Sequence, residues 1–163
     1  MASRIFKRKA YQKLLEWKRD SAGKTALLIE GARRIGKSTL VEQFAKKEYK
    51  SYILIDFANI KPQVSNLIAN GFADLDDFFT RLQFLSGVQL YERQSLIIFD
   101  EVQLQPLARQ AIKYLVKDGR YDYVETGSLI SIRQNVQNIV IPSEEERIQM
   151  FPMDYEEFCW ALG

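Results

Sequence analysis

Residues 31–38 read GARRIGKS and satisfy the pattern G-x-x-x-x-G-K-[ST]. It follows an apolar run at residues 25–30 (TALLIE) and precedes a segment, from Lys37 to about Lys47, with apolar residues at helical spacing. A glycine-rich turn between a buried strand and a helix is the context that this pattern requires. The pattern therefore predicts a phosphate-binding loop, or P-loop.

Each residue type in this loop has a physical role. The two glycines let the backbone turn tightly, with no Cβ atom between the loop and a phosphate. Consecutive backbone N–H groups then face a concavity, to which the N-terminus of the following helix adds a positive field. Lys37 supplies a mobile cation for the β- and γ-phosphates, and Ser38 supplies a hydroxyl oxygen for Mg²⁺. The candidate nucleotide-binding residues are Gly31, Ala32, Arg33, Arg34, Ile35, Gly36, Lys37, Ser38 and Thr39, of which Arg33 and Arg34 either assist the phosphates or face solvent.

A second signal is the acidic pair Asp100-Glu101, which follows the apolar run at residues 95–99 (SLIIF). Ligands of open α/β sheets bind at the carboxyl ends of the strands. If this strand lies beside the P-loop strand, Asp100 reaches the magnesium hydration shell, and Glu101 orients or deprotonates the attacking water. The alternative is that the two acids cap the helix that begins near Leu104. The P-loop upstream favours the first interpretation, so Ser38 and Asp100 are the candidate metal residues.

Further candidates lie near later strand ends. Thr126 or Ser128 is expected to hydrogen-bond the γ-phosphate or the attacking water, although Ser128 also suits the N-cap of the next helix. Arg133 lies in the apolar stripe of that helix, and Arg147 follows an acidic run. For each arginine two roles are open. It is either an arginine finger, which stabilises the transferring phosphoryl group, or a side chain that serves a local partner. The candidate catalytic residues are therefore Lys37, Glu101, Thr126, Ser128 and Arg147.

The rest of the chain alternates apolar strands with helices, which is typical of a parallel sheet covered on both faces. The clearest helix spans about 104–117, with Pro106 in its opening turn and Gly119 just past its end. We therefore expect one α/β domain over residues 1–163, with a three-layer P-loop NTPase fold and a five-stranded, mainly parallel sheet. The expected strands are 25–30, 51–56, 95–99, 121–126 and 147–151, and the expected helices are a basic one in 1–20, then 37–47, 75–82, 104–117 and 128–139.

Composition narrows the class of protein. The 163 residues are 47% hydrophobic and 27% charged, as in globular domains. No apolar run approaches the roughly 20 residues that cross a bilayer, and the N-terminus lacks the apolar stretch of a secretory signal. The chain has no histidine, which excludes histidine catalysis and histidine metal ligation. The single Cys159 cannot form an internal disulfide, so we expect a cytoplasmic location and no membrane partner.

Charge is unevenly distributed. The net charge is +2, but residues 1–20 hold seven basic and two acidic residues, which gives +5 in that segment. A basic segment of this kind either meets the phosphates of nucleic acid or is a solvated helix face. Three classes of partner remain open. They are a nucleotide, a second copy of the chain, and DNA or another protein. The third would be bound through this basic helix or through a further C-terminal domain.

Four motifs together resemble a known family. They are GARRIGKS at 31–38, LIIFDEVQ at 96–103, VETGSLI at 124–130 and MFPMDYEEFCWALG at 150–163. In combination they are similar to the AAA-domain ATPases of bacteria and archaea that carry an uncharacterised C-terminal domain. The resemblance covers nearly the whole chain. Many ATPases share the P-loop and the acidic pair. What is specific to this family is the combination of both with ETGS and the ending PMDYEEF.

The resemblance implies an AAA+ type P-loop sheet, ATP and Mg²⁺ as cofactors, and hydrolysis that drives a conformational change. Family members usually continue past PMDYEEF into a helical segment and another domain, whereas this chain stops at Gly163. We therefore expect an ATPase core without its C-terminal lid, either cut from a longer protein or encoded by a short gene. By the same resemblance Lys37 and Ser38 are the Walker A ligands, Asp100 and Glu101 the Walker B pair, Thr126 or Ser128 the first sensor, and Arg147 the family's last-strand arginine, here preceded by Glu146 instead of Gly.

Two other functions compete with hydrolysis. One is a nucleotide-dependent DNA- or protein-binding module with little turnover. The other is a small-molecule kinase, which an acidic pair suited to activating water disfavours. The choice of ATP over GTP rests on the resemblance and on the lack of a guanine-reading N-K-x-D run.

Overall fold

The computed structural model describes residues 6–128 and 142–163. In this part of the chain the strands pair in parallel throughout, in the sheet order β2-β3-β4-β1-β5. The strands are β1 Ala26–Gly31, β2 Ser51–Asp56, β3 Ser95–Asp100, β4 Asp122–Ser128 and β5 Glu145–Gln149. The helices are α1 Ala10–Asp20, α2 Lys37–Glu48, α3 Pro62–Asn70, α4 Leu75–Ser86, the 3-10 helix η1 Val102–Leu104, α5 Pro106–Asp118 and α7 Tyr155–Leu162.

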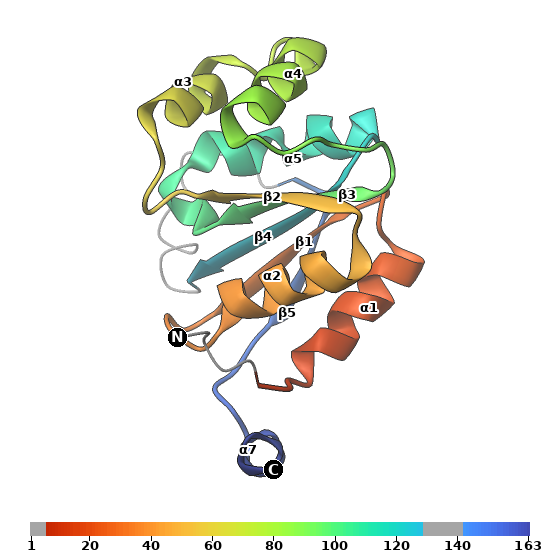
Figure 1. The fold of residues 1–163 in the computed structure, drawn as a ribbon, viewed down its shortest axis with the longest axis vertical. Helices are drawn as coiled ribbons and strands as arrows, with labels where there is room; N and C mark the ends of the chain where they lie inside the picture. The colour runs from red at the N-terminus through yellow and green to blue at the C-terminus, as the bar shows by residue number, and fades with distance from the viewer. Residues whose placement is uncertain (1–5, 129–141) are drawn as a thin grey trace.

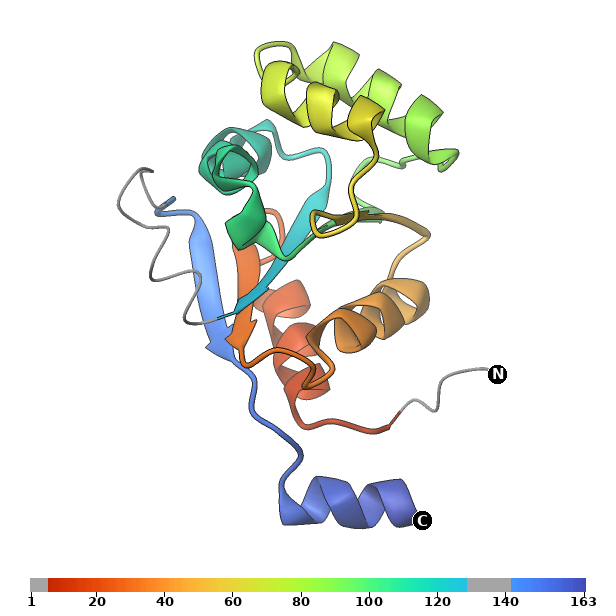
Figure 2. The same ribbon diagram turned by 90° about the vertical axis from the view of Figure 1, so that its left-hand side faces the viewer.

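Helices cover both faces of the sheet (Figure 1). α1 and α2 pack on one face, and α3, α4 and α5 pack on the other. α7 lies apart from these layers, at the end of the molecule where the chain stops (Figure 2). The three-layer α/β fold with a five-stranded parallel sheet is therefore confirmed.

The alternation of side chains along each strand builds two cores. β1, β3 and β4 are central and buried along their whole length, which explains the nearly continuous apolar sequences of β1 and β3. Leu27 and Ile29 face the α1–α2 layer, while Leu28 faces the α3–α5 layer, because successive side chains point to opposite faces. The same two-residue period decides which polar side chains at the strand ends face the P-loop.

Helix ends follow the predicted signals in α5. Gly119 adopts a left-handed φ of 78° just past the helix, and Pro106 occupies its first position. The helix begins at Pro106 and not near Leu104, because the residue before a proline is driven out of the helical region. The preceding residues, Val102–Leu104, form η1 instead.

Two further predicted spans were wrong at their ends, and a third falls outside the described residues. The first helix begins at Ala10, so residues 6–8, which have no regular structure, and Lys9, which lies in a turn, are not part of a basic helix. The last strand spans Glu145–Gln149 because pairing with β1 sets its register, and an edge strand tolerates exposed charged residues. The helix expected at 128–139, with Arg133, lies outside the described residues.

Two α-helices, α3 and α7, were not predicted. α3 is only nine residues long and half polar, so its apolar period is weak. α7 follows Asp154, whose side chain caps it in a reciprocal capping box with Glu157. None of the helices in the described residues has the length and apolarity that crossing a bilayer requires.

Candidate functional site

The P-loop joins the carboxyl end of β1 to the N-terminus of α2. Gly36 adopts a φ of 96°, a left-handed conformation that glycine reaches without steric cost. At Gly31 a Cβ atom would lie 2.4 Å from the carbonyl oxygen of Met150, so no larger side chain fits there. Backbone geometry therefore requires both glycines of the motif.

Lys37 is buried at the centre of the loop, with 4% of its surface exposed. Its Nζ donates to the carbonyl oxygens of Ala32 at 2.6 Å and Gly31 at 3.2 Å. Burial lowers the pKa of Lys37, while the nearby Glu101 and Asp100 carboxylates oppose that shift. A phosphate oxygen would offer this ammonium a charged acceptor in place of neutral carbonyls.

Three oxygens from three elements converge beside the loop. Ser38 Oγ donates to Asp100 Oδ1 at 2.6 Å, and Thr126 Oγ1 donates to the same oxygen at 2.5 Å. Asp100 lies two and four residues after Ile98 and Leu96, so it points to the same α1–α2 face as they do. The strand period therefore aims the carboxylate at the first turn of α2.

Asp100 reaches the P-loop although its strand is not next to β1. β4 lies between β3 and β1, so the condition that the two strands are neighbours is not met. α2 leaves the loop and packs across β4, β3 and β2, which carries Ser38 over β4 to Asp100. The intervening strand contributes Thr126 to the space between them.

Glu101 has a strained backbone at this site. Its φ of 59° and ψ of 50° lie in the left-handed region, which costs a residue with a side chain about 1–3 kcal/mol. The backbone N–H of Glu101 donates to Thr126 Oγ1 at 3.1 Å, and Oε2 of its carboxylate accepts from Gln103 Nε2 at 2.5 Å. Neither η1 nor α5 has a side-chain cap, so capping does not explain the acidic pair.

The remaining predicted site residues lie outside the cluster of Ser38, Asp100 and Thr126. Ser128 is buried at the end of β4 and pairs in register with Gly31. Arg147 approaches Glu145 at 3.3 Å and Glu30 at 3.6 Å, so it has the local ion pairs that were its alternative. The exposed residues of the loop and of the first turn of α2 are Ala32, Arg33, Arg34 and Thr39.

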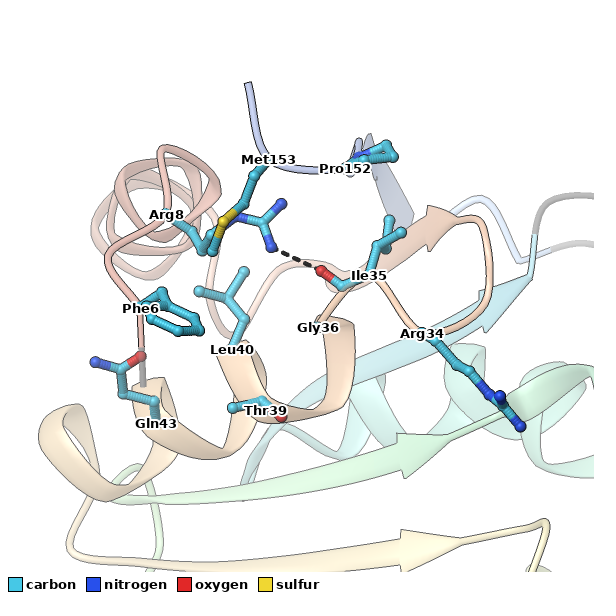
Figure 3. Close-up of a pocket in the computed structure, with 10 residues that line it drawn as sticks. All are labelled: Phe6, Arg8, Arg34, Ile35, Gly36, Thr39, Leu40, Gln43, Pro152 and Met153. Atoms are coloured by element: carbon cyan, nitrogen blue, oxygen red, sulfur yellow. Dashed lines mark hydrogen bonds between the residues drawn. The ribbon is translucent and has the colours of Figure 1, made fainter. Parts of the chain in front are cut away.

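A pocket of about 360 Å³ adjoins the P-loop (Figure 3). One wall is the loop and the start of α2, and the other walls come from the segment before α1 and the segment between β5 and α7. In Figure 3, Arg8 reaches across to the carbonyl of Ile35. The lining residues are Phe6, Arg8, Arg34, Ile35, Gly36, Thr39, Leu40, Gln43, Pro152 and Met153.

Sequence reasoning missed Arg8 and the segments at both ends of the chain. Arg8 is one of seven basic residues among the first twenty, and nothing in their spacing separates it from the others. Its contacts with residues 35 and 157 depend on the tertiary fold. A local pattern carries no signal of such contacts.

The donor set fits a metal that arrives with a phosphate. In residues 6–128 and 142–163 no group of three or more acidic or cysteine side chains could hold a metal ion alone. Ser38 and Asp100 offer a hydroxyl and a carboxylate close together. Mg²⁺ usually keeps several waters and binds through one or two carboxylates and substrate phosphates.

Comparison with known proteins shows the family to which the chain belongs. A family model described as an AAA domain matches residues 23–159. No curated protein matches the chain. Among solved structures, the chain is similar to C. elegans PCH-2, with 11% identity and a TM-score of 0.46, over 88% of this chain and 42% of that chain. The chain thus spans less than half of that structure's length. The family match extends over most of the chain, so this protein belongs to the AAA domain family, a family of nucleotide-binding modules of ATPase type.

Proposed function

We propose that this chain binds ATP with Mg²⁺ at the P-loop and hydrolyses it to ADP and phosphate. The observation that carries this proposal is the meeting of Ser38 and Thr126 at Asp100 Oδ1, at 2.6 and 2.5 Å. It supports a site in which the P-loop serine and the strand-end carboxylate share one cation. Phosphate binding alone would not require that arrangement.

Lys37 and the loop backbone hold the phosphates in this proposal. Lys37 exchanges its two carbonyl acceptors for β- and γ-phosphate oxygens. Ser38 and Asp100 hold Mg²⁺, which would neutralise charge that develops on the phosphoryl group. Gly31 and Gly36 keep the loop close enough for backbone N–H groups to donate to the phosphates.

Glu101 acts on the attacking water. Its carboxylate accepts the water proton as oxygen bonds to the γ-phosphorus and the bond to the β-phosphate oxygen breaks. Gln103 holds that carboxylate by a hydrogen bond, which supports a defined orientation for it. Thr126 and Ser128, at the end of β4, are the proposed contacts to the γ-phosphate or the water.

The nucleoside occupies the pocket beside the loop. Phe6, Leu40 and Met153 give it an apolar wall, as ligand pockets for flat aromatic groups commonly have. Gln43 adds an amide that can both donate and accept a hydrogen bond. This lining supports a nucleotide rather than a bare phosphate as the ligand.

Arg147 is a poor finger in this arrangement, because its partners are Glu30 and Glu145. The remaining candidates are Arg133, outside the described residues, and an arginine of a second copy of the chain. An arginine acting between copies would make turnover per chain rise with protein concentration.

DNA binding through the basic N-terminal segment receives no support from the contacts. Lys9 pairs with Asp154 and Glu156, each at 2.7 Å, and Arg8 pairs with Glu157 at 2.8 Å. Charges already paired within the protein release fewer counterions from a nucleic acid.

The test is phosphate release from Mg-ATP. We expect turnover by the wild type and loss of at least about 100-fold in Glu101→Gln, because removing a general base costs about 10²–10⁴. Glu101→Gln should still bind ATP, and Glu16→Gln, on the exposed face of α1, is the matched control. Equal turnover by Glu101→Gln and the wild type would contradict the assigned base.

A further inference from the structure

One partly buried arginine joins the P-loop to α7. The side chain of Arg8 is 9% exposed. Its Nη1 donates to the carbonyl of Ile35 at 2.6 Å and its Nη2 to the carbonyl of Phe151 at 2.6 Å. Its Nε donates to Glu157 Oε2 at 2.8 Å, which makes an ion pair. A single planar guanidinium therefore contacts the P-loop, the segment after β5 and α7.

α7 is attached to the rest of the protein mainly by polar contacts. Glu157 is the buried residue of this helix, and its Oε2 also accepts from the backbone N–H of Lys9 at 3.0 Å. Tyr155 and Leu162 are 83% and 70% exposed, so little apolar burial holds the helix. The Nζ of Lys7 lies 4.4 Å from the centre of the Trp160 ring. Residues 7–9 therefore supply most of the docking contacts of α7.

The pocket beside the P-loop depends on the same docking. Phe6 and Arg8 line it from one side, and Pro152 and Met153 line it from the segment that leads into α7 (Figure 3). A ligand in this pocket contacts both segments only when they are docked. Such a ligand binds the docked arrangement more tightly and shifts the population toward it.

We propose that Arg8 couples nucleotide occupancy of the P-loop to the docking of α7. Bound nucleotide stabilises α7 against the sheet domain, and a docked α7 strengthens nucleotide binding, because such coupling is reciprocal. The inference rests on the proposed nucleotide site and extends it, since it makes α7 the element through which nucleotide state is transmitted. Arg8 is a positioning residue here, which acts through the Ile35 carbonyl and the Glu157 carboxylate.

The charge on Glu157 makes its contact with Arg8 an ion pair. Burial alone would raise the pKa of Glu157, yet the hydrogen bonds from Arg8 and from the backbone of Asp154 and Lys9 hold it below its usual value. The pair is therefore ionised at neutral pH, and loss of one charge leaves the other buried without a counter-charge. Lysine cannot replace the planar fork that makes three contacts in different directions.

The experiment compares two adjacent glutamates of α7. Glu157→Gln removes the Arg8 ion pair, but glutamine still serves in the capping box. Glu156→Gln is the matched control, because it makes the same change on the same helix and loses only an exposed pair with Lys9. Arg8→Lys is the second test variant. For each, calorimetry gives the affinity for a non-hydrolysable ATP analogue with Mg²⁺, and amide hydrogen exchange reports on residues 155–162.

We expect the analogue to slow exchange in α7 of the wild type and of Glu156→Gln. In Glu157→Gln and Arg8→Lys we expect affinity to fall at least about five-fold, with the slowing lost, in line with typical coupling between sites. Wild-type affinity and α7 protection in both variants would overturn the coupling and leave the nucleotide site intact. Weaker binding with unchanged α7 protection would also overturn it, since Arg8 would then support only the loop. A wild type that binds no analogue would overturn both proposals.

Discussion

At the scale of single residues, three ionisable side chains are buried between α5 and the sheet: Arg109, Glu125 and Glu145. Arg109 of α5 pairs with Glu145 of β5 at 2.8 Å, with their side chains 3% and 0% exposed. Glu125 of β4 lies beside them and is fully buried. Burial, and then the charge of Glu145, raise the pKa of Glu125 well above its usual value. Glu125 therefore holds its proton more tightly than a free glutamic acid does, beside the ion pair of Arg109 and Glu145.

This arrangement predicts a stability that falls as pH rises. Because the folded protein holds the Glu125 proton more tightly than the unfolded chain, its contribution is complete below the unfolded pKa of about 4.3 and is lost as pH rises through the folded pKa. Glu125→Gln keeps the shape and cannot ionise. The free energy of unfolding, from urea titrations, should favour Glu125→Gln increasingly above about pH 5, by about 1.4 kcal/mol per pKa unit of the raised value. A difference between the two proteins that does not change with pH would contradict a raised pKa for Glu125.

Removal of the counter-ion should be more damaging. Arg109→Ala leaves Glu145 buried without its closest cation, which in other buried pairs costs about 3–5 kcal/mol. Lys113→Ala, on the exposed face of α5, is the control and should change the free energy of unfolding by no more than about 0.5 kcal/mol. Urea unfolding curves measure both. Equal effects of the two substitutions would show that Arg109 is not needed by the buried acids.

At the scale of elements, the P-loop is confined between β1, α2 and the segment after β5. A Cβ at Gly31 would lie 2.4 Å from the backbone carbonyl of Met150, whereas one at Gly87 would meet nothing within 4 Å. Met150 N in turn donates to the carbonyl of Glu30 at 2.7 Å, which fixes that segment against β1. The loop therefore has no room to accept a larger residue unless the segment after β5 moves away.

A pair of alanine substitutions tests this confinement. Gly31→Ala should weaken nucleotide binding and destabilise the fold by about 1–3 kcal/mol, because the clash is with backbone. Gly87→Ala, with a positive φ in open space, should cost about 1–2 kcal/mol of stability and leave nucleotide affinity unchanged. Calorimetric titration and thermal unfolding separate the two effects. Unimpaired nucleotide binding by Gly31→Ala would mean that β5 does not confine the loop.

At the scale of the whole molecule, the sequence was sufficient for the features that depend on local pattern. Continuous apolar runs predicted β1 and β3, and the spacing of GARRIGKS predicted the turn between β1 and α2. Features that depend on contacts between distant segments could not be predicted from the sequence. The position of β4 between β1 and β3, the docking of α7 and the burial of Arg8 each depend on tertiary packing. No period or motif in the chain encodes them.

If Ser38 and Asp100 bind Mg²⁺ together with ATP, the affinity for the nucleotide must depend on magnesium and on both side chains. Calorimetric titration of a non-hydrolysable ATP analogue, with and without Mg²⁺, is carried out on the wild type, Ser38→Ala and Asp100→Asn. We expect Mg²⁺ to tighten binding to the wild type at least about ten-fold, a difference of about 1.4 kcal/mol, and to have little effect on either variant. Wild-type affinity that does not respond to Mg²⁺, or a response retained in both variants, would contradict the site described above.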